Sequence, residues 1–91
     1  MNQNKWFVYI LRCKDNSMYT GITDNLKRRL SQHREGKGAK YTRGRAPLTL
    51  HHIEEYETKG EALRRELEIK RLTTAEKRAL ISEEPLSEAD L

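Results

Sequence analysis

Runs of apolar residues mark two short strands at the start of the chain. Residues 6–12 begin with an apolar run and are rich in aromatic and β-branched types, which is typical of a buried strand. Residues 14–17 are polar turn formers, and residues 18–22 return to a pattern with aromatic and β-branched residues. We therefore expect a β-hairpin here.

Helix-forming residues and then a glycine-rich basic loop follow the hairpin. Asp24 is the expected N-cap of a helix over residues 25–35, in which good helix formers follow one another. Gly36 and Gly38 are expected to end this helix. Residues 36–47 then form a loop that carries several lysines and arginines.

The second half predicts one more strand and two helices, and the same capping pattern precedes each helix. Thr58 and Glu61 have capping-box spacing, and so do Thr73 and Glu76. The expected elements are a polar strand over residues 48–56, a helix to about residue 72 and a short helix to about residue 81. This order of strands and helices predicts a small α/β layer structure.

The length of the chain predicts one small domain. A chain of 91 residues has a thin core and favours a shallow groove over a deep pocket. We assign the domain to residues 1–81 and expect residues 82–91, which are acidic and contain Pro85, to form a disordered tail. The longest apolar run is too short for a bilayer, and the single cysteine suits a cytoplasmic protein without disulfides.

Positive charge is concentrated in one segment. The net charge is +4, but residues 24–45 carry eight Lys/Arg against two acidic residues, whereas residues 46–91 carry an acidic excess. Such a segment is typical of a surface that contacts phosphates. A solvated basic helix gives the same pattern, so charge alone leaves both interpretations open.

Helical spacing brings Arg29 and His33 to the edge of the first helix's apolar stripe. With 3.6 residues per turn, both lie beside Leu26 and Leu30 and look towards the sheet. Each also has an ordinary structural explanation. An arginine stem can cover apolar surface, and a histidine can be a half-buried imidazole with satisfied hydrogen bonds.

Glu66 falls within the apolar stripe of the second helix, between Ala62 and Ile69. A carboxylate on a buried face is costly unless it is paired or binds a cation. The spacing therefore leaves two interpretations, which are an internal ion pair, for example with Arg29, and a metal ligand.

The hairpin register decides whether Tyr9 and Tyr19 lie on the same face of the sheet. They share a face only if the loop has an odd number of residues or a bulge. Both can equally be ordinary strand aromatics. The neighbouring His51 and His52 are poor joint metal ligands, because adjacent strand residues point to opposite faces, and we expect one inward and one solvated.

Taken in order, these positions resemble the GIY-YIG nuclease superfamily over about residues 6–81. The resemblance includes the loop of residues 38–47, which is similar to the branch of structure-specific endonuclease subunits and, within it, to very small uncharacterised bacterial proteins. Each motif alone is weak, whereas the ordered set is specific. The matching positions are Val8-Tyr9-Ile10, Tyr19-Thr20-Gly21, Arg29 with His33, and Glu66.

The resemblance implies a three-stranded mixed antiparallel sheet flanked by three helices, and cleavage of nucleic acid with one Mg²⁺ or Mn²⁺. Tyr9 matches a tyrosine proposed as general base, and Tyr19 matches the second tyrosine of the same site. Arg29 matches an arginine that contacts the phosphate. His33 matches a residue that positions and protonates the leaving group. Glu66 matches the metal-binding glutamate.

The basic loop supplies candidate contacts to nucleic acid. A planar aromatic ring can stack on a base or sugar, and lysines and arginines can follow the phosphates. The candidates are Lys37, Lys40, Tyr41, Arg43 and Arg45. We expect DNA as the partner, branched or single-stranded, with no membrane contact and with room for a protein partner.

Some positions depart from the family pattern. Phe7 replaces the first motif glycine, and Met18 and Ile22 stand where some members carry a lysine that could acidify a phenol. The main hypothesis is a metal-dependent endonuclease. The alternatives are a nucleic-acid-binding module with weak or no cleavage, a nuclease subunit that needs a partner, and a protein-interaction domain with an acidic contact face.

Overall fold

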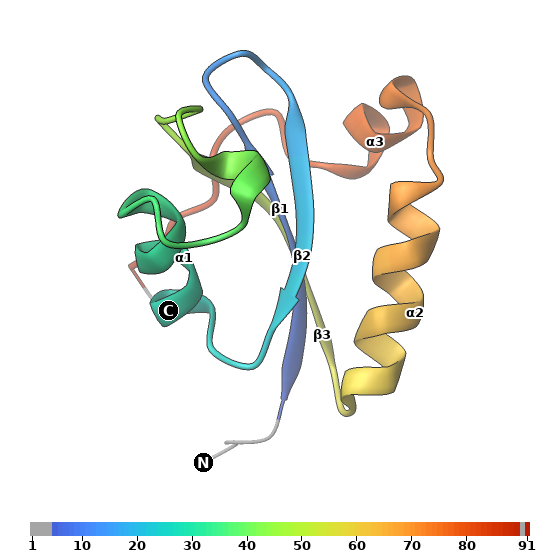
Figure 1. Ribbon diagram of the computed structural model, residues 1–91. Coiled ribbons are helices and arrows are strands. Elements are labelled where there is room, and N and C mark those ends of the chain that lie inside the picture. Colours follow the sequence, from blue (N-terminus) through green and yellow to red (C-terminus); the bar gives the residue numbers. More distant parts are fainter. Residues whose placement is uncertain (1–4, 90) are drawn as a thin grey trace.

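The protein folds into one antiparallel sheet with helices on both faces (Figure 1). The computed structural model describes residues 5–89 and 91. Its strands, in the spatial order β2-β1-β3, are β1 (Trp6–Arg12), β2 (Met18–Thr23) and β3 (Thr49–Tyr56). The helices are α1 (Leu26–Arg34), α2 (Lys59–Lys70) and α3 (Thr74–Leu80), with a 3₁₀ turn η1 (Lys40–Thr42). The predicted α+β fold is confirmed.

The hairpin register places the two motif tyrosines on one face. Arg12 lies opposite Met18, so the loop between them has an odd number of residues. Within this loop the Asp15 carboxylate accepts from the backbone N–H and the hydroxyl of Ser17. Tyr9 and Tyr19 therefore point to the same side of the sheet, as one of the two registers considered above requires.

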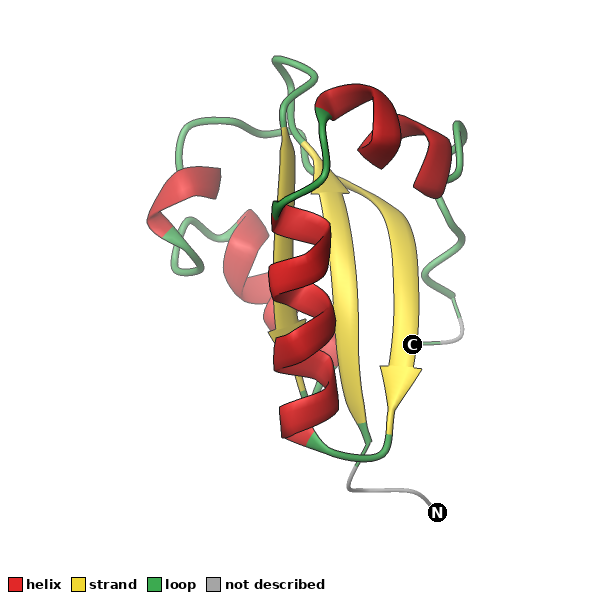
Figure 2. Cartoon of the chain, turned by 90° about the vertical axis from the view of Figure 1, so that its right-hand side faces the viewer, coloured by secondary structure: helices red, strands yellow, loops and turns green. Residues whose placement is uncertain are grey.

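Alternation along the central strand β1 divides the core into two layers. Tyr9 and Leu11 face α1 and pack with its buried leucines, Leu26 and Leu30. The intervening residues of β1 face α2, which lies across the other side of the sheet (Figure 2). Burial on both faces explains why residues 6–11 form a nearly continuous apolar run.

Local capping sets the helix boundaries. The two predicted capping boxes are both present, at the starts of α2 and α3. The predicted N-cap of α1 was wrong by one residue. Asn25, not Asp24, accepts a hydrogen bond from the backbone N–H of Arg28, at 3.0 Å. Asp24 instead pairs with the Arg28 side chain.

The end of α1 is a tight reversal that sends the chain back towards the sheet. Gly36 has a positive φ of 76°, which a glycine adopts without strain. Its N–H donates to the carbonyl of His33, and the Lys37 N–H donates to the carbonyl of Gln32. This pair of bonds is a Schellman motif and satisfies two carbonyls at the helix end.

The segment of residues 82–91 differs from the disordered tail that its acidic composition predicts. In its described part, the Leu86 N–H donates to the carbonyl of Leu50 at 2.8 Å, and Glu88 pairs with Arg34 at 2.6 Å. Leu86 and Leu91 pack on the core layer of α1. Apolar anchors and a basic partner hold a segment whose local sequence signals disorder.

The described residues include no helix that is both long and apolar enough to span a lipid bilayer.

Candidate functional site

Gly21 lets two phenol rings meet over the edge strand β2. Tyr9 lies directly opposite Gly21 in the hairpin, and its ring centroid is 6.2 Å from that of Tyr19. A Cβ atom added to Gly21 would lie 2.6 Å from the Tyr9 hydroxyl oxygen and 2.9 Å from Cε2 of Tyr19. A glycine is therefore required for this arrangement.

His33 connects Tyr9 to the glycine-rich loop through a chain of hydrogen bonds. Its Nε2 lies 2.8 Å from the Tyr9 hydroxyl, and its Nδ1 lies 3.0 Å from the Thr42 hydroxyl. The Thr42 hydroxyl donates to the carbonyl of Ala39, so it accepts from the imidazole. His33 therefore carries its proton on Nδ1, and its Nε2 accepts from Tyr9.

The loop packs against His33 closely enough to need a second glycine. A Cβ atom on Gly38 would lie 2.4 Å from Nδ1 of His33 and 2.9 Å from its Cα. Gly38 was predicted only as a helix terminator, and its close approach to the imidazole was missed. Thr42 was missed too, because a threonine in a basic loop gives no sequence signal of its contact.

Burial sets the protonation states of this cluster. Tyr9 has no exposed surface, and burial raises the pKa of its phenol to about 12, although the nearby Arg29 guanidinium acts to lower it. Burial, assisted by the charge of Arg29, lowers the pKa of His33 to about 4. Near neutral pH, therefore, Tyr9 is a neutral donor and His33 is a neutral acceptor.

Arg29 lies where the helical spacing predicts, partly buried beside these side chains. Its guanidinium donates to the side-chain carbonyl of Gln32 at 3.1 Å. Its charge affects the pKa values of both Tyr9 and His33. A planar donor fork in this position can bind a phosphate oxygen.

Glu66 is turned towards the protein body, on the opposite face of the sheet from α1. Its side chain is only 14% exposed, and a carboxylate oxygen lies 3.2 Å from Nζ of Lys70. The ion pair considered for Glu66 is therefore present, with Lys70 in place of Arg29. The Glu66 charge also acts to raise the pKa of Tyr9, as the smallest of the causes.

A groove at the free edge of β2 joins the two sides of the sheet. Its volume is about 220 Å³. Its lining residues come from β2, η1, α2 and α3 and are Met18, Tyr19, Thr20, Tyr41, Lys70 and Lys77. We call this the β2-edge groove. Lys70 and Lys77 were not predicted as site residues, although Lys70 lies one helical turn after Glu66, on the same helix face.

The basic loop holds Tyr41 and Arg45 in a stack beside this groove. The Tyr41 ring stacks on Tyr19 with centroids 6.0 Å apart, and the Arg45 guanidinium lies 4.5 Å from the Tyr41 centroid. Arg45 also pairs with Asp15 of the hairpin loop. Lys40 and Arg43 are exposed, and Nζ of Lys37 lies 3.8 Å from a carboxylate oxygen of Glu35.

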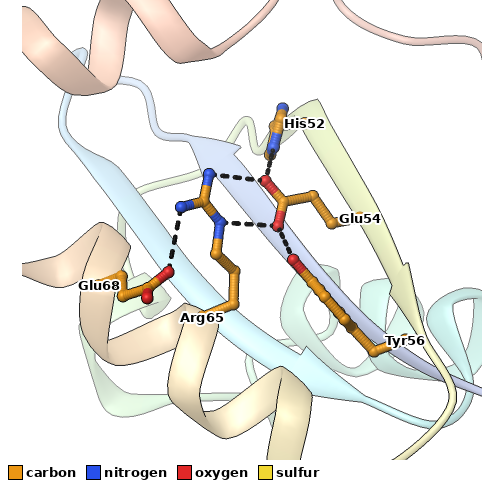
Figure 3. Close-up of polar contacts among 5 residues, drawn as sticks. All are labelled: His52, Glu54, Tyr56, Arg65 and Glu68. Carbon is orange, nitrogen blue, oxygen red and sulfur yellow. Dashed lines mark hydrogen bonds and ion pairs between the residues drawn. The ribbon is translucent and has the colours of Figure 1, made fainter.

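A second polar cluster lies between β3 and α2, away from the motif tyrosines (Figure 3). The Glu54 carboxylate accepts from Arg65, Tyr56 and His52. Burial acts to raise the pKa of Glu54, but these hydrogen bonds outweigh it and lower the pKa to about 2. One of the two adjacent histidines was expected to be solvated, and His52 is the one that lies here. Its side chain is instead only 18% exposed, because Glu54 holds it.

His51 is buried, as expected for one of the two adjacent histidines. Its Nδ1 lies 2.8 Å from the carbonyl oxygen of Ser82, and its Nε2 lies 2.9 Å from the Thr49 hydroxyl. The two histidines therefore have separate partners. Among the described residues, no group of three or more His, Cys, Asp or Glu side chains could hold a metal together.

Comparison with known proteins gives the same motifs a wider context. Residues 5–79 match the family model described as the GIY-YIG catalytic domain. A UPF0213 protein of Bacillus velezensis is 51% identical over 83 residues, covering 91% of this chain and 84% of that protein. A UPF0213 protein of Halobacterium salinarum is 52% identical over 73 residues, and the match covers 80% of this chain and 95% of the Halobacterium protein.

Two solution NMR structures share the fold. A UPF0213 protein from Bacillus halodurans is 48% identical, with a TM-score of 0.55, and the match covers 82% of this chain and 80% of that chain. A protein from E. faecalis is 41% identical, with a TM-score of 0.62, over 86% of this chain and 83% of that chain.

Proposed function

Because this chain belongs to the GIY-YIG family and to its UPF0213 group, we propose that it cleaves phosphodiester bonds in nucleic acid with one divalent metal ion. The observation that carries this proposal is the convergence at the edge of β2. Two phenols, a neutral imidazole and an arginine lie on one side of the sheet. A mostly buried carboxylate, Glu66, lies on the other side, and its charge acts to raise the pKa of Tyr9.

Glu66 fits a weakly held, oxygen-ligated ion. It is a half-buried carboxylate whose partner is a flexible lysine, and a Mg²⁺ or Mn²⁺ ion that keeps most of its waters needs only one or two carboxylates. Such an ion supplies Lewis acidity at a phosphate oxygen and acidifies bound water. With an ion on the Glu66 carboxylate, the Lys70 ammonium would lose this partner and would be available to a phosphate.

The burial of Tyr9 changes the roles that the family resemblance implies. Its hydroxyl has no solvent contact and donates to His33, so we propose that Tyr9 is a positioning residue. Tyr19 lines the β2-edge groove and is therefore the phenol that contacts the substrate. His33, with its pKa lowered to about 4, is neutral near pH 7 and positions Tyr9 rather than protonating a leaving group.

Arg29 and the basic loop are then the phosphate contacts. Arg29 places its donor fork beside the phenols, where charge develops on the phosphate. The loop side chains Lys37, Lys40 and Arg43 are exposed to follow the nucleic-acid backbone. Arg45, already paired with Asp15, holds Tyr41 in place and contributes less to phosphate binding.

A second candidate function is nucleic-acid binding without efficient cleavage. The observation that favours it is the fully buried Tyr9 phenol, whose pKa is raised to about 12. In addition, no lysine flanks the second motif tyrosine, Tyr19. A phenol with this pKa is a poor base near neutral pH. In this case the protein binds DNA and either does not cut it or cuts it only with a partner.

Mutation of the carboxylate separates the two functions. Labelled single-stranded and branched DNA are incubated with the protein in Mn²⁺ or in EDTA. We expect Mn²⁺-dependent cleavage that Glu66→Gln lowers at least about 100-fold, with binding in EDTA retained. The control is Glu68→Gln, on the same helix but exposed and paired with Arg65. Equal cleavage by Glu66→Gln and the parent contradicts the metal assignment.

A further inference from the structure

Two lysines line the β2-edge groove, and among the described residues only Lys70 has an anionic partner. Lys77 of α3 is half-buried at the groove and makes no ion pair within residues 5–89 or with residue 91. Lys70, at the end of α2, shares its charge with Glu66. Lys77 lines the groove as a partly exposed residue, so its ammonium is available to an anionic ligand. This wall of the groove therefore favours an anion.

The opposite wall is apolar and fixed in place. Met18 and Tyr41 line the groove together with the ring of Tyr19. Tyr41 is held between Tyr19 and Arg45, so its position is set before any ligand arrives. Because Tyr19 and Arg45 already lie against the Tyr41 ring, a ligand contacts this wall through the Met18 side chain and the ring edges. A wall that is already ordered makes such contacts at a low cost in conformational entropy.

Size limits what can enter. The groove measures about 220 Å³, which is below the range of roughly 300–1,000 Å³ typical of drug-sized pockets. One nucleotide fits this scale, whereas a base pair does not. A base within a duplex would first have to leave its stack and its partner. The groove therefore suits an unpaired nucleotide.

We propose that the β2-edge groove binds one unpaired nucleotide next to the bond that is cut. Its phosphate lies between Lys70 and Lys77, and its base lies against Met18 and Tyr41. This inference rests on the proposed function and assigns its substrate class, which is nucleic acid with a single-stranded segment at the cleavage point. Tyr19 belongs both to this groove and to the candidate active site, which makes the two sites continuous.

The test measures binding in EDTA, where cleavage does not interfere. The probes are a short fluorescent oligothymidylate and a blunt fluorescent duplex of equal length, titrated over a range of salt concentrations. We expect the single strand to bind at least about tenfold more tightly. Lys77→Met should weaken its binding about fivefold and lower the salt slope by about 0.7, the value for one single-strand phosphate contact.

Matched variants separate a specific contact from net charge. Lys59→Met removes the same charge at the far end of α2 and should keep the parent's salt slope. Lys77→Arg should restore most of the affinity. Thermal unfolding shows whether each variant is folded. The proposal is overturned if Lys77→Met binds the single strand with the parent's affinity and slope, or if the duplex binds as tightly with the same Lys77 dependence.

The outcome is independent of cleavage. Lys77-dependent binding of the single strand by a protein that cuts nothing in Mn²⁺ supports the groove and contradicts the nuclease. Cleavage that requires Glu66, in a protein whose single-strand binding ignores Lys77, supports the nuclease and overturns the groove.

Discussion

Two tyrosines in this protein have phenol pKa values raised to about 12, for different physical reasons. Tyr9 owes the shift to burial. Tyr56 owes it first to its hydrogen bond with the Glu54 carboxylate and then to burial. Tyr9 packs against Tyr19, which lines the β2-edge groove. Tyr56 lines a smaller pocket of about 150 Å³, but in the cluster of Figure 3 each charged group already has a partner. A perturbed pKa therefore indicates function only where an adjacent site can still bind something.

The largest predicted effect comes from a substitution at Gly21, where the rings of Tyr9 and Tyr19 meet. Gly21→Ala places a methyl group 2.6 Å from the Tyr9 hydroxyl oxygen, so both rings must move. We expect a loss of about 1–3 kcal/mol in unfolding free energy and nearly complete loss of activity. Urea unfolding and the cleavage assay measure the two effects.

Gly60→Ala is the matched control, since the nearest atom to its added Cβ is 4.0 Å away. Within α2 this change should leave stability unchanged or raise it by up to about 1 kcal/mol. A Gly21→Ala protein that is as stable and active as the parent would show that the two phenols need no close approach.

The next prediction compares phenols on the two sides by their effect on cleavage. Tyr19→Phe removes the hydroxyl of the phenol that lines the groove and should lower the cleavage rate about 100-fold. Tyr56→Phe removes a hydroxyl that only donates to Glu54 and should leave the rate unchanged. Single-turnover cleavage of labelled DNA gives both rates. Equal losses of cleavage rate in the two variants would contradict a specific role for the phenol that lines the groove.

Acid should destabilise the two clusters in different pH ranges. His33 binds its proton in the unfolded chain near pH 6.5 but in the folded protein only near pH 4. Folding stability is therefore full above pH 6.5 and falls by about 2 kcal/mol as the pH decreases to 4, allowing for solvent screening. Glu54 has a pKa lowered from 4.5 to about 2, so its contribution of about 1–2 kcal/mol is lost between these values.

Urea unfolding at a series of pH values checks both ranges. His33→Gln should remove the dependence between pH 6.5 and 4 and leave the lower range intact. Glu54→Gln should do the reverse. If His33→Gln keeps the upper dependence, another group titrates there and the imidazole is not the buried neutral acceptor described above.

The sequence predicted those features that depend on local spacing. The apolar strand segments, the two capping boxes and the helical spacing of Arg29, His33 and Glu66 all follow from positions close together in the chain, and the structure agrees. The predicted fold was confirmed for the same reason. The assignment of catalytic, metal and nucleic-acid roles to these residues stays a prediction.

Features that depend on distant partners were missed. The contact of Thr42 with His33 requires a loop to fold back on a helix, and the docking of Leu86 near Leu50 requires the finished sheet. Lys77 reaches the groove only because α3 packs beside the end of α2, an arrangement with no periodic signal in the sequence.

The smallest predicted effect concerns Lys70, which connects the candidate metal ligand to the groove. Its ammonium lies 3.2 Å from the Glu66 carboxylate and must leave before a divalent ion binds. Partly exposed ion pairs contribute about 0.2–1 kcal/mol, so Lys70→Met should raise the affinity for Mn²⁺ about twofold to fivefold. Electron paramagnetic resonance of free Mn²⁺ measures this without any cleavage. Lys59→Met, with the same change in net charge, should have no such effect. If both variants raise the affinity equally, the gain comes from net charge, and Lys70 does not compete with the metal ion for the Glu66 carboxylate.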